Sequence, residues 1–442
     1  FYGISLAGGG TMNVGDLNPN IIGSGTGNNA ILYKGNAAIN NYLGGSAPRA
    51  GGTPFIDALT SSYTNSFYAI HVLASGTIPH QVQGNVITNI DFRNYYNFYG
   101  ISLAGGGTIY VGDLNANSIG SGTGNNAILY KGNAAINNFY GIYANLSSTT
   151  TNVSLIKNNS IGSISSAATN NAYDTNILGI YVASTGTNTL KIVQNTIGST
   201  DGATTNSIAA TSPSTSYVQN VSGITVAVNK PVQIIGNTIA KLYNAGTGTL
   251  THNVQGITVS GSSFIIDNTI YDLKSNSDAN TDANISTSVG GIVHNGSTTG
   301  YASSIKGNRI YNLMNLNATT AAVNLIGIYF NGSSTLSNQI SGNYIYNIIP
   351  NSNSTATTVY GIKIVSGLST YANNIINLGG DYKSNYTGIY ETGAVGNDNK
   401  FYFNTINISG TVNSGTNSST ALYSAVNTNV KEFKNNIFVN TR

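Results

Sequence analysis

The chain has 442 residues, no cysteine and a formal net charge of +3, and only 7% of its residues are charged. Without cysteine it can form neither a disulfide framework nor a thiolate metal site, and its 17 Lys and Arg residues form no run, so we expect no nucleic-acid partner. No apolar stretch is long enough for direct membrane insertion, while Ile, Val, Leu and Tyr recur regularly enough to build a core.

The chain opens with a segment that it later repeats almost unchanged. Residues 1–43 return as residues 98–140, and 37 of these 43 positions are identical. Such identity exceeds what a shared architecture requires, so we interpret the pair as a recent duplication of scaffold. Between the copies, residues 44–66 contain Gly and Pro and interrupt the pattern, which indicates a loop insertion.

An Asn two places before Ile marks the rest of the chain. The mark returns every 30 to 42 residues, a period typical of solenoid coils or propeller blades. Its Asn residues, the last with Phe in place of Ile, are Asn85, Asn117, Asn159, Asn195, Asn237, Asn268, Asn308, Asn343, Asn374, Asn404 and Asn436. Asn visits the left-handed backbone region readily, so we expect it to make a tight corner. We also expect its amide to bond to those of the coils above and below in a structural ladder, with the following Ile pointing into the core.

A second mark, Gly followed by Ile as in Gly256-Ile257, alternates with the first, and a β-rich segment such as 190–193 lies directly before the Asn. Each repeat thus holds three short strands with period-2 alternation, separated by Gly, Asn, Ser and Thr. The period drifts and hairpin turns are rare, which argues against a propeller. We predict an all-β chain in which residues 1–442 form one right-handed parallel β-helix solenoid of about 12 coils, with three short strands per coil.

The longest connections follow the Asn strand, at residues 198–222, 240–255, 271–290, 311–326 and 346–360. Stacked coils would bring these connections to one ragged edge rich in Ser, Thr, Asn and Ala. Insertions gathered on one side often form the binding face of a solenoid, and they are equally tolerated as plain surface loops. Both interpretations stay open at the level of sequence.

Acidic side chains are few. Of the 14 carboxylates only Glu391 and Glu432 are Glu, and no pair recurs at successive coils, so we expect no catalytic residues and no cofactor. Asp278, Asn280 and Asp282 alternate like the oxygen ligands of a calcium loop, but the glycine and the last acidic ligand of such a loop are missing. These three residues are a weak calcium candidate.

Histidine and tyrosine give two further expectations. The four histidines, His71, His80, His252 and His294, lie far apart in the sequence, so we expect solvent-facing or loop positions and no metal site. Among the 29 tyrosines, three follow the Asn corner at the same phase and are expected to stack on successive coils: Tyr271, Tyr311 and Tyr346. Such a row would serve either as a ladder for sugar rings or, more simply, as edge packing with the hydroxyls in water.

The motif Gly-Asn-x-Ile-Tyr-Asn, followed by Leu or Ile, occurs at residues 307–313 and 342–348, together with Tyr-Gly-Ile-Tyr elsewhere in the chain. In these motifs the chain resembles the right-handed parallel β-helix repeat proteins of the bacterial cell surface, of the adhesin or filament type found in Bacteroidota. The resemblance covers nearly the whole chain. It implies an extracellular or cell-surface location and a large precursor with an export signal and a C-terminal sorting domain.

We therefore expect a non-enzymatic structural or adhesive segment of a large extracellular bacterial protein. It would be a stiff stalk or filament whose loop edge binds surface glycans or other copies of the chain. The chain begins and ends within the repeat pattern, as expected for a segment of a longer polypeptide. The alternative is a glycan-processing β-helix, either a polysaccharide lyase or hydrolase or a phage-type tailspike, and it predicts a cluster of carboxylates along one strand face.

Overall fold

A computed structural model describes residues 2–8, 13–14, 20–22, 31–34, 66–75, 78–94, 97–132, 136–147, 153–166, 174–186, 189–212, 217–248, 250–281, 283–318, 321–352, 354–393, 396–412 and 417–442. These residues form β-strands and their connections, with no helix among them. The described part of the chain therefore has no helical segment of the length and apolarity that crossing a membrane requires.

The strands form three parallel sheets, which we call A, B and C in the order in which each coil visits them. Sheet A consists of β1 (Tyr2–Gly8), β5 (Phe67–Ala74), β9 (Phe98–Gly105), β13 (Ile136–Leu146), β17 (Asp174–Ser184), β21 (Asn220–Val226), β24 (Asn253–Val259), β27 (Val289–Asn295), β30 (Asn324–Asn331), β33 (Thr358–Ser366), β36 (Asn385–Glu391) and β39 (Ser419–Ser424). Sheet B consists of β2 (Asn13–Val14), β6 (His80–Val82), β10 (Ile109–Val111), β14 (Val153–Lys157), β18 (Thr189–Val193), β22 (Val232–Ile235), β25 (Ser263–Ile266), β28 (Ser304–Lys306), β31 (Asn338–Ser341), β34 (Ser369–Ala372), β37 (Asn399–Tyr402) and β40 (Lys431–Lys434). Sheet C consists of β3 (Ile21–Ile22), β4 (Ile31–Lys34), β7 (Val86–Ile87), β8 (Ile90–Asn94), β11 (Ser118–Gly120), β12 (Ile128–Gly132), β15 (Ser160–Gly162), β16 (Ile164–Ser166), β19 (Thr196–Gly198), β20 (Ile208–Ala210), β23 (Thr238–Asn244), β26 (Thr269–Ser275), β29 (Arg309–Asn315), β32 (Tyr344–Pro350), β35 (Ile375–Gly379), β38 (Thr405–Ser409) and β41 (Ile437–Asn440).

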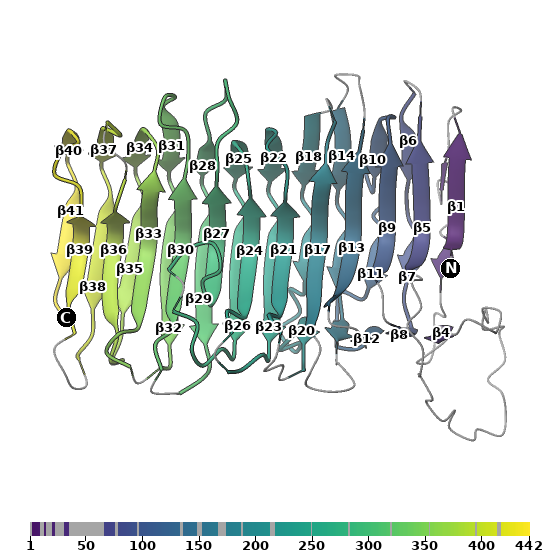
Figure 1. Cartoon of the computed structure of the whole chain (residues 1–442), viewed down its shortest axis with the longest axis horizontal. Helices are drawn as coiled ribbons and strands as arrows, with labels where there is room; N and C mark the ends of the chain where they lie inside the picture. The colour runs from purple at the N-terminus through teal and green to yellow at the C-terminus, as the bar shows by residue number, and fades with distance from the viewer. Residues whose placement is uncertain are drawn as a thin grey trace.

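The coils stack into a straight rod. Figure 1 shows the strands of sheet A running upward on the near side, after which the chain crosses to the far side and advances toward the C-terminus, so the winding is right-handed. Sheets A and B each contain 12 strands, one per coil. At about 4.8 Å per coil the rod is on the order of 60 Å long. The prediction of a right-handed parallel β-helix of about 12 coils is confirmed.

The coils from β1 to β20 contain four strands, where the sequence predicted three. In them sheet C is divided into two short strands, such as β15 and β16, which are separated by Ser163 with a left-handed φ of 55°. In later coils the two halves merge into one strand such as β23, although Lys241 at the same position keeps a φ of 60°. A bend at this position is thus common to both kinds of coil, and the early coils interrupt the strand there.

The tight corner between sheets B and C uses a left-handed residue, but this residue is not the Asn of the mark. Asn237 does not have a positive φ, whereas Gly236 before it has a φ of 64°. The same corner position, with φ between 51° and 65°, is occupied by Gly84, Asn158, Gln194, Gly236, Asp267, Gly307, Gly342, Asn373, Phe403 and Asn435. Our expectation that the marked Asn makes the bend was wrong. Its predecessor makes the bend, which leaves the Asn free to turn its side chain inward.

The Ile of the mark forms the centre of the core. Ile239, Ile270 and Ile310 have no exposed surface and are register partners on neighbouring strands. The Gly of sheet A packs directly against this row. A Cβ on Gly256 would lie 2.6 Å from Ile270 Cγ2 and 2.6 Å from the carbonyl oxygen of Gly291, closer than real Cβ contacts. Glycine is therefore required at this position by lack of space.

The two near-identical segments are not neighbours in the stack. β1 pairs with β5, and β5 pairs with β9, so one coil of different sequence separates the copies. That coil continues the core without a break, since Phe67 stacks on Phe98 at 4.9 Å and Phe98 stacks on Phe139 at 4.8 Å between ring centroids. Residues 44–65 of the expected loop insertion lie outside the described residues.

The connections from sheet C to sheet A form one edge of the rod, which Figure 1 shows at the bottom of the view. They are shorter than the sequence suggested because the strands of sheet C extend into them; β26, for example, leaves only residues 276–288 as a connection. This loop is tied to sheet A, because the side chains of Lys363 and Gln255 donate hydrogen bonds to the carbonyl oxygens of Ala283 and Ile285. A small apolar cluster separate from the main core is buried in the same region, at Val293, Ile326 and Tyr329.

Candidate functional site

A ladder of Asn side chains runs through the buried corner between sheets B and C. At Asn237, Nδ2 donates to Asn268 Oδ1 at 3.0 Å and to the carbonyl oxygen of Ile192 at 2.9 Å. Its Oδ1 accepts hydrogen bonds of 2.9 Å from both the backbone N and Nδ2 of Asn195. Only 1% of Asn237 is exposed. The hydrogen-bonding capacity of this buried amide is therefore fully used.

Equivalent bonds join all the marked residues from Asn85 to Asn436, with Nδ2 to Oδ1 distances of 2.8 to 3.0 Å. In each rung the donor Nδ2 belongs to the coil nearer the N-terminus. The structure adds Asn20, whose Nδ2 donates to Asn85 Oδ1 at 3.0 Å. Asn20 precedes Ile22 in the same mark. Sequence reasoning missed it because the 65 residues to Asn85 exceed the period.

Histidine is buried more than the sequence suggested. His80, His252 and His294 have no exposed surface. His252 lies in the connection before β24, as expected for a loop position, but His80 and His294 lie on β6 and β27, so our expectation was wrong for these two. His294 occupies an inward position of β27 that Val259 and Phe330 fill in the adjacent coils. Polar partners in the corner between sheets A and B make its burial possible.

The partners of His294 fix its tautomer. Nδ1 lies 3.2 Å from the carbonyl oxygen of Asn331, and Nε2 lies 2.8 Å from Ser303 Oγ. A carbonyl oxygen only accepts, so Nδ1 carries the proton and Nε2 accepts from the hydroxyl. Burial lowers the pKa of His294 to about 4. The ring is therefore neutral in the folded protein at neutral pH.

Acidification is expected to destabilise the fold through His294. The unfolded chain takes up a proton near pH 6.5, while the folded chain does so only near pH 4, so the stability contribution present above about pH 6.5 is lost as the pH falls between these values. The total loss is roughly 3 kcal/mol. Urea unfolding of the parent and of His294→Val, measured between about pH 7 and pH 4.5, checks this. A parallel decline of the two proteins would contradict the assignment.

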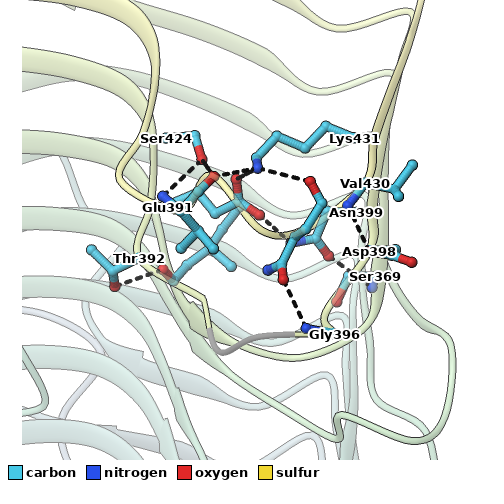
Figure 2. Close-up of polar contacts among 12 residues, drawn as sticks. Ser369, Glu391, Thr392, Gly396, Asp398, Asn399, Ser424, Val430 and Lys431 are labelled. Carbon is cyan, nitrogen blue, oxygen red and sulfur yellow. Dashed lines mark hydrogen bonds and ion pairs between the residues drawn. The ribbon is translucent and has the colours of Figure 1, made fainter.

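A second buried polar cluster lies at the last two turns between sheets A and B. Glu391 ends β36 with no exposed surface and is the register partner of the inward-facing Ile364. Its Oε1 accepts a hydrogen bond from Asn399 Nδ2 at 2.6 Å, and its Oε2 lies 3.7 Å from Lys431 Nζ. Figure 2 shows the three side chains converging from β36, β37 and β40. A carboxylate with no exposed surface cannot be reached by a polysaccharide, so we interpret this cluster as structural.

Further contacts at Lys431 and at Glu391 hold the cluster in place. Lys431 Nζ also donates to the carbonyl oxygens of Val426 at 2.6 Å and Asn429 at 3.3 Å. Tyr371 is buried beside Glu391, and burial raises the pKa of its phenol, with the charge of Glu391 adding to the shift. Sequence reasoning noted Glu391 only for its rarity. Its register position, which Val259, Phe330 and Ile364 fill in earlier coils, was the signal that could have revealed its burial.

Tyr271, Tyr311 and Tyr346 stack on sheet C. Their ring centroids are 5.0 and 4.9 Å apart, and their planes differ by 3° and 2°. Arg309 lies 4.8 Å from the Tyr311 ring centre and donates from Nη2 to the Tyr346 hydroxyl at 2.6 Å. The ring faces cover one another, so mainly edges and hydroxyl groups remain for contact. This arrangement favours edge packing over a ladder for sugar rings.

The calcium candidate is only partly described, because Asp282 lies outside the described residues. Asn280 is fully buried, and its Nδ2 donates to the carbonyl oxygens of His252 at 2.9 Å and Ser286 at 2.8 Å. Its side chain thus ties the loop 276–288 to the preceding coil. Among the described residues, His, Cys, Asp and Glu form no group of three or more that could hold a metal ion. A calcium site with Asp278 stays a prediction.

Three large apolar side chains are exposed to solvent on consecutive coils beside the corner between sheets B and C. Tyr344 is 37% exposed, Ile375 48% and Phe403 53%, and we call these three residues the corner patch. Tyr344 and Ile375 are register partners on sheet C, whereas Phe403 is the corner residue before Asn404, with a φ of 54°. A left-handed φ costs a bulky residue roughly 1 kcal/mol or more. Phe403 is thus a strained residue with an exposed ring.

Charged side chains flank the corner patch on sheet B. The hydroxyl of Tyr402 donates to Glu432 Oε2 at 2.5 Å, and Lys434 forms an ion pair with Glu432 Oε1. The hydrogen bond from Lys434 is the main cause that lowers the pKa of Glu432, and the bond from Tyr402 adds to it. Tyr402 directly precedes Phe403, so this polar group lies on the sheet B side of the corner that Phe403 occupies.

Searches of protein families, of curated proteins and of solved structures find no significant match to the chain. The likeness to bacterial cell-surface β-helix proteins therefore rests on the repeat motifs alone. Function has to be argued from the geometry of the rod and its surfaces.

Proposed function

We propose that the chain is a non-enzymatic structural or adhesive segment, a stiff stalk or filament within a large extracellular protein. The observation that carries this proposal is the Asn ladder, which bonds each coil to the next with the same chemistry from Asn20 to Asn436. Each strand of sheets A and B pairs only with strands of adjacent coils, as in other solenoids. Bending the rod would strain many rungs at once. The structure is therefore suited to keeping its two ends a fixed distance apart.

The repeat motifs support an extracellular or cell-surface location. Their resemblance to β-helix proteins of the bacterial cell surface favours an extracellular or cell-surface position and an adhesin or filament type. The loop edge is the natural place for contacts with surface glycans or further copies of the chain. There, a groove of about 690 Å³ is lined in part by the polar residues Asn347, Asn351, Asp381, Tyr382 and Lys383.

Mechanical unfolding tests the stalk. When the rod is pulled from its two ends in an atomic force microscope, we expect it to lose one coil at a time, because coils interact chiefly with their neighbours. Each step would release the 30 to 42 residues of one repeat, roughly 100 to 150 Å of extended chain.

Two results would count against the proposal. One is a single cooperative rupture with no sub-steps, since a rod built from equivalent coils should not release all of them together. The other is the release of reducing ends or unsaturated sugars when the protein is incubated with acidic and neutral polysaccharides. That second result would favour the alternative of a glycan-processing enzyme.

A further inference from the structure

We propose that the buried cluster of Glu391, Asn399 and Lys431 is a site of self-catalysed covalent modification. Lys431 Nζ and Asn399 Cγ become joined in an isopeptide bond, with Glu391 as the catalytic residue and ammonia as the leaving group. The bond links β37 to β40 and so fastens one coil to the next. This inference is independent of the stalk proposal, because the reaction needs only the folded cluster.

The first observation is the placement of the three side chains. Asn399 and Lys431 are register partners on neighbouring parallel strands, so their Cα atoms lie about 4.8 Å apart. Glu391 Oε1 accepts a hydrogen bond from Asn399 Nδ2 at 2.6 Å, and Glu391 Oε2 lies 3.7 Å from Lys431 Nζ. Figure 2 shows that the carboxylate lies between the other two side chains. A single acidic group therefore contacts both the nucleophile and the leaving group.

The second observation is the orientation of the Asn399 amide. The backbone N–H of Ser369 donates to Asn399 Oδ1 at 3.0 Å. Because a backbone N–H only donates, this bond fixes the amide oxygen toward Ser369 and the amide nitrogen toward Glu391. A donor aimed at the carbonyl oxygen stabilises the negative charge that develops there when Cγ is attacked. Glu391 is in position to protonate Nδ2 as it leaves.

The third observation is the burial of the cluster. Glu391 and Asn399 are buried, and the fully buried rings of Tyr371 and Phe401 stack beside them with centroids 5.2 Å apart. Within the described part of the chain, Glu391 Oε2 has no hydrogen-bond partner, so it is open to a proton from Lys431. Transfer of that proton removes two buried charges at once, and an apolar environment favours such a step.

Asn338 shows what the same position does without an acid and a lysine. It lies two coils before Asn399, and its Oδ1 likewise accepts from a backbone N–H of the preceding coil, at 2.9 Å. Its register partner in the next coil is Ser369, and Phe330 occupies the position of Glu391. An Asn that only satisfies the backbone therefore needs neither charged residue. At Asn399 both are present, in a chain that has only two Glu residues.

The reaction balances without any other reactant. Lys431 Nζ gives a proton to Glu391 Oε2, turns away from the carbonyl oxygens that hold it, and attacks Asn399 Cγ as a free amine. Glu391 passes the proton through Oε1 to Nδ2 and takes a second proton from the attacking nitrogen. The bond between Cγ and Nδ2 breaks, ammonia leaves, and an amide between Cγ and Nζ remains. Glu391 ends neutral, so no unpaired charge stays buried, and nothing is oxidised or reduced.

The ion pair of Glu391 and Lys431 is the state of the cluster before the bond forms. A cross-link between Asn399 and Lys431 restricts the unfolded chain, as a disulfide does, and therefore stabilises the coil that contains β40. Stability comparisons among variants of Glu391 have to use parent chains that have lost no ammonia, because the bond adds its own stabilisation.

Intact-mass spectrometry of the full chain tests the proposal. We expect the folded parent, incubated at neutral pH, to become lighter than its sequence by about 17 Da, the mass of one ammonia. Trypsin should then leave residues 401–434 uncut at Lys431 and joined to residues 384–400. Glu391→Gln should form the bond roughly 100-fold more slowly, because it lacks the acid and base. Lys431→Met should keep the full mass of its sequence.

Lys434→Met is the matched control, because it removes a lysine of the same strand that pairs with Glu432 on the surface. It should lose ammonia as the parent does. Circular dichroism establishes that each variant is folded. The mass of the parent decides the question even where a variant fails to fold.

Four results would overturn the proposal. The first is an unchanged mass of the folded parent after incubation, and the second is a loss of about 17 Da without the joined peptides, which indicates a succinimide at an Asn. The third is a loss of about 18 Da, one water, which assigns the bond to Glu391 itself. The fourth is equal linkage in the parent and Glu391→Gln. None of these results bears on the stalk, which mechanical unfolding tests separately.

Discussion

Asn237→Ala is expected to lower the free energy of unfolding by about 3 to 5 kcal/mol. The substitution removes the acceptor for two donors of Asn195 and the donor for the oxygens of Asn268 and Ile192. These groups are buried, and each unsatisfied group costs about 1 to 3 kcal/mol before the chain relaxes. Urea unfolding followed by circular dichroism gives the stability change. Hydrogen exchange gives its location, since the backbone amide of Asn195 should exchange faster.

Asn436→Ala is the matched control. Asn436 is partly exposed, so water can replace its bonds to Asn404 and the carbonyl oxygen of Phe401, and we expect a loss of only about 1 kcal/mol. Equal losses for the two variants would show that burial of the ladder does not govern its strength. Unchanged unfolding of Asn237→Ala would remove the structural role of the ladder altogether.

Glu391→Leu is expected to lower the free energy of unfolding by about 3 to 5 kcal/mol. The substitution leaves the ammonium group of Lys431 nearly buried without its counter-charge. The side chain of Lys431 is 14% exposed and that of Glu391 is fully buried. Adding Lys431→Met should restore most of the loss, since a buried ion pair can be replaced by apolar side chains of similar size with little net change. Thermal or urea unfolding of the two single variants and the double variant completes the cycle.

Lys434→Met supplies the control for this cycle. It breaks the ion pair with Glu432 on the surface, where water solvates both charges, so we expect no measurable change in stability. If the double variant were as unstable as Glu391→Leu, the stability loss would come from the missing hydrogen bond to Asn399. The unpaired charge of Lys431 would then not be its cause.

The repeat itself could be predicted because every copy contains the residues that its structure requires. The buried Ile row needs one Ile at the same phase in each coil, and the glycine of sheet A is needed because the Ile side chain leaves no space for a Cβ. Periodicity therefore revealed the three sheets and their order. It misassigned the bend to the marked Asn, because a sequence shows where Asn recurs but not which of two adjacent residues has the positive φ.

The exceptional positions could not be predicted in the same way. Glu391 and Lys431 are 40 residues apart and form a pair only because stacking brings adjacent coils together. His294 is buried because Ser303 and the carbonyl oxygen of Asn331 lie within hydrogen-bonding distance of its ring. The spacing of residues in the sequence does not reveal these contacts. Phe403 is visible in the sequence once the corner positions are aligned, but its significance depends on its left-handed φ and exposed ring. Repeats predict what coils share, and function has to be sought where they differ.

The direction and uniformity of the Asn rungs bear on how such a chain can evolve. Each rung offers a coil the same donor and acceptor whichever coil comes next, so a whole coil can be gained or lost without a change in the bonding of those that remain. Residues 1–43 and 98–140 look like such an event, and the repeat length of 30 to 42 residues shows how loosely one coil constrains another. Natural selection thus constrains the residues that shape the cross-section of the rod, and it leaves the number of coils free to vary.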